Sequence, residues 1–196
     1  MDEMKSAFEK AMEKVEKIEK ASEGELLKWK YIPEGQRLAV RYLKDECNLA
    51  VEVGKYEDKT KRFIVEGAEE ILLRNINLPA NYFARKNNKK AMEAIKALKR
   101  DKAGVENVYS KIRRIFAHYE QEGEQQRRQA YEMLRQDFQG KIQQAIQKQG
   151  GLPAGAKINI ESQPQFQQEW RMVLTQLDSQ YQKLLEQYKQ EIVSIR

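Results

Sequence analysis

Apolar residues near the C-terminus recur every eleven residues. In FQQEWRMVLTQ, LDSQYQKLLEQ and YKQEIVSIR the recurring residues are Phe166, Trp170 and Val173, then Leu177, Tyr181 and Leu184, then Tyr188, Ile192 and Ile195. Eleven residues over three turns keep such a stripe on one side of a nearly straight helix. The period therefore predicts a helix over 165–195 whose stripe faces a core.

The same period runs through an earlier segment that contains a very polar decade, EQEGEQQRRQ at 120–129. Tyr109, Ile112 and Phe116 precede the decade and reappear 22 residues later as Tyr131, Leu134 and Phe138. A loop would have no reason to preserve this phase, and Gly123 costs only about 1 kcal/mol in a helix interior. We therefore predict one helix over 104–149, roughly 70 Å long, in which the decade is helical but has no core.

Residues 150–164, GGLPAGAKINIESQP, join these two helices. Two glycines at the start of this loop provide a stop for the first helix, and a connection of this length reverses the chain. The result is an antiparallel hairpin that pairs 130–149 with 166–186. Alternation in Lys157–Ile160 is compatible with a short strand added to a partner's sheet, or with two isoleucines that fold back over the hairpin.

Prolines divide the rest of the chain. Pro33, Pro79, Pro153 and Pro164 leave the segments 1–32, 34–78, 80–152 and 165–196, each with a period near that of a helix. In the first segment, Met4, Phe8, Met12, Val15 and Ile18 share one helical face. Ser22 and Glu25 form a capping box for a short second helix. Segment 34–78 contains one helix or two, with Gly54 or Gly67 as a possible bend.

These patterns predict an all-α protein with two parts. A helical bundle body covers 1–119, and a long antiparallel helical hairpin, coiled-coil-like with 11-residue periodicity, covers 120–196. Helix 104–149 is shared between them. The surface composition changes at the same place, because 19 of 20 glutamines lie at or after residue 121 and 18 of 23 lysines lie before residue 120.

Composition excludes several classes of protein. The single cysteine, Cys47, cannot form an internal disulfide and fits a reducing compartment. The N-terminus is charged throughout, unlike a secretory signal, and no run of 18 apolar residues predicts a membrane span. We expect a cytoplasmic protein that does not bind membranes.

Few residues here could support catalysis or bind a cofactor or metal. His118 is the only histidine, and Ile115 stands where a di-iron Glu-x-x-His motif needs glutamate. The loop sequence GGLPAGAK resembles a phosphate-binding loop, but Ala156 stands where that motif needs lysine. We expect no catalytic residues, no cofactor and no metal, and hence a non-enzymatic protein.

Basic side chains gather on one arc of the predicted helix ARKNNKKAMEAIKALKRDK. The residues of this basic face are Arg85, Lys86, Lys89, Lys96 and Arg100, and Arg114 extends the basic region. Residues 85–114 contain eleven basic and three acidic residues, and Tyr82 on the same arc could stack on a base. The face is either an ordinary solvated surface or a binding site for RNA or DNA, including a ribosome-associated role.

The C-terminal stripe offers a second candidate surface. Tyr181, Leu184, Tyr188, Ile192 and Ile195 have few partners if they lie beside the polar decade. That end of the stripe therefore either docks on the body or pairs with another chain, such as a second copy or a protein partner. This surface favours an interaction or assembly protein, and the nucleic-acid-binding reading is the alternative.

From MDEMKSAFEKAMEKVEKIEK to PQFQQEWRMVLTQLDSQYQKLLEQYKQE, the chain resembles a bacterial all-helical protein family of unknown function. The resemblance lies in the overall sequence and rests on no diagnostic motif. It implies a bacterial cytoplasmic protein and identifies no functional residue.

Overall fold

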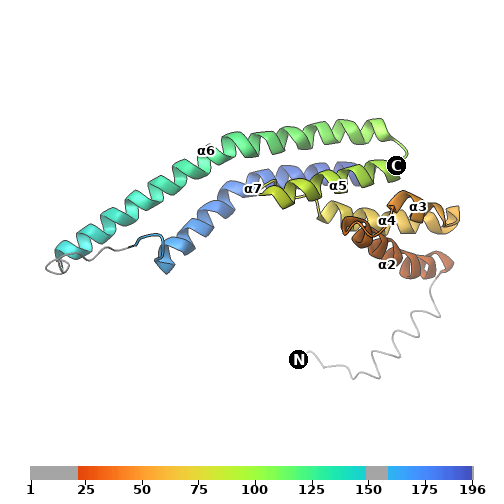
Figure 1. Cartoon of the computed structure of the whole chain (residues 1–196), viewed down its shortest axis with the longest axis horizontal. Coiled ribbons are helices and arrows are strands. Elements are labelled where there is room, and N and C mark those ends of the chain that lie inside the picture. Colours follow the sequence, from red (N-terminus) through yellow and green to blue (C-terminus); the bar gives the residue numbers. More distant parts are fainter. Residues whose placement is uncertain (1–21, 149–158, 196) are drawn as a thin grey trace, which may run out of the picture. The chain divides into compact units, whose positions relative to one another are not determined.

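The computed structural model describes residues 22–148 and 159–195 and is all-α within them. Six helices occupy these described residues, in the order α2 (Glu23–Leu43), α3 (Leu49–Gly54), α4 (Asp58–Arg74), α5 (Tyr82–Leu98), α6 (Lys102–Lys148) and α7 (Pro164–Ser194) (Figure 1). The predicted all-α bundle is confirmed. The predicted apolar face between Met4 and Ile18 lies outside the described residues.

Contacts divide the chain into two compact units. The first contains the described residues up to Ile76 together with Lys86–Lys102, and the second contains Asn77–Arg85 and the chain from Ala103 onward. The division of a body from an arm at 119 and 120 stays a prediction.

Helix α2 begins as its sequence predicts but continues further. Ser22 accepts a hydrogen bond from the Glu25 backbone N–H (3.4 Å), and the Glu25 carboxylate accepts one from the Ser22 backbone N–H (2.8 Å), which confirms the capping box. The predicted boundary at Pro33 is wrong, because α2 runs through Pro33 to Leu43. An internal proline removes one helical hydrogen bond and costs about 3 kcal/mol, so tertiary packing must offset this cost.

That packing is a backbone-to-backbone contact between α2 and α4 at two glycines. A Cβ added at Gly35 would lie 2.0 Å from the Ile64 carbonyl oxygen, and one added at Gly67 would lie 2.1 Å from that of Ile32. Only residues without a side chain allow helices to approach so closely. The close approach buries Leu38, Ile64 and other apolar side chains of both helices.

The open question about segment 34–78 is answered by three helical pieces. The end of α2 is followed by the short helix α3 and then by α4. Gly54 is the last residue of α3, whereas Gly67 lies inside α4, which continues through it.

Two lysines, one in the middle of α5 and one just beyond its end, connect this segment to other parts of the first unit. Lys90 Nζ donates to the Leu43 carbonyl oxygen at 2.9 Å and also pairs with Asp45. Beyond the end of α5, Lys99 Nζ lies 2.8 Å from Glu69 Oε1 of α4, and both side chains are largely buried. Arg100 follows the end of the helix at Leu98, so it does not extend the helical face as the sequence predicts.

In the second unit, α6 is a single helix that passes through the polar decade, as predicted. It runs antiparallel to α7, because α6 residues with higher numbers contact α7 residues with lower numbers. Lys111 pairs with Glu191, Tyr119 contacts Asp178, and Phe138 packs on Phe166. The predicted hairpin is confirmed, and its pairing reaches well beyond residues 130–149 and 166–186.

One expectation about the decade is wrong. It has a packed side, because Gly123 is buried and its missing side chain leaves room for the Tyr181 hydroxyl. Part of the loop 150–164, including Lys157 and Ile158, lies outside the described residues. Asn159 and Ile160 belong to a turn in which the Gln163 N–H donates to the Ile160 carbonyl.

Candidate protein-binding groove

Aromatic rings set the register of the hairpin toward its connecting loop. Tyr131 meets Trp170 and Phe166 edge to face, with ring centroids 5.1 and 5.6 Å apart, and Phe138 meets Phe166 at 5.3 Å. Edge-to-face pairs of this kind are favoured by the ring quadrupoles and stabilise a specific arrangement. The 11-residue stripes of α6 and α7 therefore interlock in this part of the hairpin.

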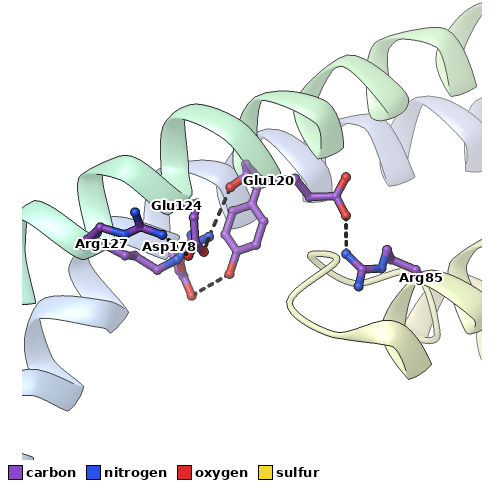
Figure 2. Close-up of polar contacts among 7 residues, drawn as sticks. Arg85, Glu120, Glu124, Arg127 and Asp178 are labelled. Carbon is purple, nitrogen blue, oxygen red and sulfur yellow. Dashed lines mark hydrogen bonds and ion pairs between the residues drawn. The ribbon is translucent and has the colours of Figure 1, made fainter.

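A polar cluster replaces the aromatic core at the middle of the hairpin. Arg127 and Glu124 of α6 converge with Asp178 of α7, whereas Glu120 points away toward Arg85 (Figure 2). The Arg127 Nη2 donates to the Tyr119 carbonyl oxygen at 3.2 Å, and its Nη1 lies 3.7 Å from Asp178 Oδ1. The guanidinium also stacks 4.2 Å from the centre of the Tyr119 ring.

The tyrosines of this region are partly desolvated. Burial raises the pKa of Tyr119, and the nearby Asp178 carboxylate raises it further, because the Tyr119 hydroxyl donates to Asp178 Oδ2 at 3.4 Å. Burial likewise raises the pKa of Tyr181. Both tyrosines therefore stay neutral at physiological pH and act as hydrogen-bonding groups.

Beside this cluster, a groove of about 850 Å³ follows the seam between α6 and α7. Its lining residues all belong to the second unit. They are Lys111, Arg114, Ile115, His118 and Gln126 of α6, and Val173, Gln176, Leu177, Gln180, Tyr181, Leu184 and Tyr188 of α7. His118 Nδ1 and the Tyr181 hydroxyl are 2.9 Å apart and connect the two walls.

The lining combines apolar side chains with neutral amides and is basic at one end. Ile115, Leu177 and Leu184 contribute aliphatic surface, and the Leu184 side chain is 44% exposed. The basic end holds Lys111 and Arg114, and none of the described residues that line the groove is a carboxylate. A concave surface with these properties can bind an amphipathic segment.

Residues 50–194 match the sequence model of a family of unknown function, DUF6657. The chain belongs to this family. No curated protein and no solved structure matches the chain. The predicted resemblance to a family of unknown function is confirmed, and the matched region includes every groove residue of this DUF6657 member, whereas α2 lies outside it.

The structure distributes the predicted interface residues between two environments. Tyr181, Leu184 and Tyr188 line the groove. Ile192 is completely buried and belongs to the core, and Ile195 is half-buried just beyond the end of α7. Only the first three line the groove, and whether they contact a partner stays a prediction.

The predicted basic face is likewise divided. Lys86 and Lys89 are exposed on α5, Lys96 is half-buried and Arg100 is exposed beyond the helix end. Arg85 donates to Glu120 of α6 at 2.9 Å, so part of its charge is compensated. Arg114 lies on the rim of the groove.

Sequence reasoning missed the polar cluster and the walls of the groove on α6. A signal for the cluster was present, since Gly123 and Arg127 stand at stripe positions of the 11-residue period. An arginine at a core-facing position requires a partner on the opposite helix. Asp178 is that partner, but it lies off the α7 stripe and no local pattern marks it.

Further expectations concern metal binding, the single cysteine and membrane-spanning helices. Among the described residues, no three His, Cys, Asp or Glu side chains gather closely enough to bind a metal ion. Cys47 is half-exposed, with its Sγ 3.7 Å from the Leu38 carbonyl oxygen. None of the described helices is both long and apolar enough to cross a lipid bilayer.

Proposed function

We propose that this DUF6657 member is a non-enzymatic protein-binding module, and that a helix from a partner protein docks in the groove between α6 and α7. The single observation that carries the proposal is the groove itself, with apolar side chains from both helices and its exposed Leu184.

The geometry of a two-helix hairpin supports this occupant. Two helices bury the sides that face each other but leave a seam along each flank, and a third helix laid in the seam makes a three-helix bundle. From Val173 to Tyr188 the groove follows α7 for about four turns, or roughly 22 Å. A partner helix of similar length would fill it through an apolar stripe of i, i+3, i+4 and i+7 side chains.

The make-up of the lining supports the non-enzymatic part of the proposal. The lining includes neither a carboxylate nor a thiol, serine or threonine that could act as nucleophile or general base. Its histidine, His118, contacts the Tyr181 hydroxyl of the opposite wall. The remaining amide, aromatic and aliphatic side chains are suited to contact a partner's surface.

The test uses a labelled amphipathic peptide of about 16 residues, with a leucine stripe and glutamine elsewhere, which makes roughly 24 Å of helix. We expect it to bind, and Leu184→Glu to weaken binding about tenfold or more because a charge would be buried. Met172→Glu is the matched control, since Met172 is an exposed α7 residue outside the groove.

Fluorescence anisotropy measures the binding, and light scattering measures the mass of the free chain. Equal binding to both variants, or no binding by either variant or the parent chain, would contradict the proposal. A dimer that Leu184→Glu converts to a monomer would also contradict it, because a second copy would then occupy the groove.

Nucleic-acid binding through α5 is the second candidate function. Tyr82 and Phe83, at the start of α5, are 67% and 75% exposed and lie on the same helix as the exposed lysines Lys86 and Lys89. Aromatic and basic side chains together are typical of surfaces that bind single strands. Retention on immobilised RNA that falls with salt, and that Lys86→Gln with Lys89→Gln reduces, would support this candidate, whereas no retention at low ionic strength would reject it.

A further inference from the structure

The charges of the groove are unevenly placed. All three lining residues that carry or can carry positive charge, Lys111, Arg114 and His118, lie on α6 within about two turns. The facing wall of α7 contributes Gln176 and Gln180 and aliphatic or tyrosine side chains, without charge. A ligand in the groove therefore meets positive charge only on the α6 wall, toward the end that contains Lys111 and Arg114.

The two neighbouring cations differ in how far they are already compensated. Lys111 Nζ lies 2.7 Å from Glu191 Oε2 and 5.3 Å from the centre of the Tyr188 ring. Arg114 is exposed, and no ion pair joins it to another described residue. Arg114 is thus the cation most available to a ligand.

The adjacent arginine shows that this placement is specific to position 114. Arg113 pairs with Glu106 on its own helix and does not line the groove. Successive helical residues point about 100° apart, so one arginine belongs to an internal ion pair and the next to the groove.

The opposite end of the groove has a different character. Glu122, one turn beyond His118 on α6, contributes to raising the pKa of Tyr181. Gln126, Gln176 and Gln180 supply neutral amides there. Attraction for negative charge is therefore confined to the end near Lys111 and Arg114.

We infer that the docking helix is acidic: an amphipathic helix of a partner protein whose carboxylates pair with Arg114 while its apolar stripe covers Leu177 and Leu184. This inference rests on the proposed function, because it specifies the chemistry of the helix that the groove binds. The exposed, planar guanidinium of Arg114 is suited to bidentate pairing with a carboxylate.

Three peptides that share one leucine stripe test the charge preference. At the other positions near one end, the first peptide carries glutamate, the second glutamine and the third lysine. Each peptide is also made with the reversed sequence, so that either docking orientation is covered. We expect the glutamate peptide to bind about fivefold more tightly than the glutamine peptide at low salt, and the lysine peptide to bind most weakly. Added salt should reduce the difference.

Arg114→Gln should abolish the preference for glutamate, whereas Arg113→Gln, the neighbouring control, should keep it. Circular dichroism confirms that both variants fold. Equal affinity for the three peptides, or a preference that survives Arg114→Gln, would overturn the inference and leave the proposed function standing. If no peptide binds, both the inference and the proposed function are overturned.

Discussion

The α2–α4 pair and the α6–α7 hairpin differ in which atoms lie between their packed helices. In the first, Gly35 and Gly67 bring two backbones into direct contact, and a proline inside α2 is tolerated. In the second, aromatic side chains and an arginine hold the helices together, and a groove remains along the seam. The backbone contact at Gly35 and Gly67 closes the space between α2 and α4 at that point, whereas packing through long side chains leaves the groove open along α6 and α7.

Glycines make this difference clear at two positions in each pair of helices. At Gly35 and Gly67 an added Cβ would meet backbone atoms, which cannot move aside. At Gly123 it would meet the ends of the Arg127 and Tyr181 side chains, and at Gly140 it would meet no atom within 4 Å. An added methyl group is therefore excluded at Gly35 and Gly67, whereas the hairpin has space for one at Gly140.

The largest expected effect is the loss of the α2–α4 contact. We expect Gly67→Ala to lower the free energy of unfolding by about 3 kcal/mol or more, because the new methyl group would overlap the Ile32 carbonyl. Denaturation with urea measures the loss. The control is Gly24→Ala in α2, where an added Cβ meets nothing within 4 Å. Equal stability of the two variants would show that α2 and α4 are not in backbone contact.

The polar cluster of the hairpin should be less sensitive. Asp178→Ala leaves the mostly buried Arg127 guanidinium without its partner on α7, and we expect a loss of about 2 kcal/mol, between the values for exposed and buried ion pairs. The double variant Arg127→Leu with Asp178→Leu should recover much of this loss, since no charge is left unpaired. If the double variant is the least stable of the set, the ion pair itself stabilises the hairpin and this expectation is wrong.

Two glycines of α6 give a smaller and opposite effect. Gly140→Ala should raise the free energy of unfolding by about 1 kcal/mol, because alanine is the better helix former and has space here. Gly123→Ala should gain less or lose stability, because its methyl group would lie 3.2 Å from Arg127 Nη1 and 3.3 Å from the Tyr181 hydroxyl. Thermal denaturation of both variants ranks them, and a larger gain at Gly123 would contradict the packing described above.

The smallest expected effect depends on pH. Burial raises the pKa of Glu69 above its ordinary value of 4.5, although Lys99 lowers it in part. The folded carboxyl therefore keeps its proton to higher pH than the unfolded chain does, and the contribution of Glu69 to stability falls as the pH rises from about 4.5 through the raised pKa.

The measurement compares the parent chain with Glu69→Gln by urea denaturation between pH 4.5 and 8. The stability of the parent relative to the variant should decrease with pH and then level off. A relative stability that increases with pH would mean that attraction to Lys99 outweighs burial.

Much of the fold was predictable because helices form through local interactions. The phase of Tyr109, Ile112 and Phe116 across the polar decade predicted an unbroken α6, and Ser22 with Glu25 predicted the start of α2. Of the groove, the sequence pattern also indicates Tyr181, Leu184, Tyr188 and Arg114. The stripe alone could not show that Ile192 is buried while Leu184 is exposed, since both residues belong to the same 11-residue apolar stripe.

The sequence by itself determined where helices form and that the last two run antiparallel, because hydrogen bonds and apolar periods act within a few turns of one chain segment. Only the tertiary structure decided that α2 continues through Pro33, that Asp178 receives Arg127, and that a groove with Arg114 on its rim follows the seam. Each of these features depends on which residues of another helix, distant in the sequence, lie opposite a given residue. That pairing is set by close packing between whole helix surfaces, and no local pattern encodes it.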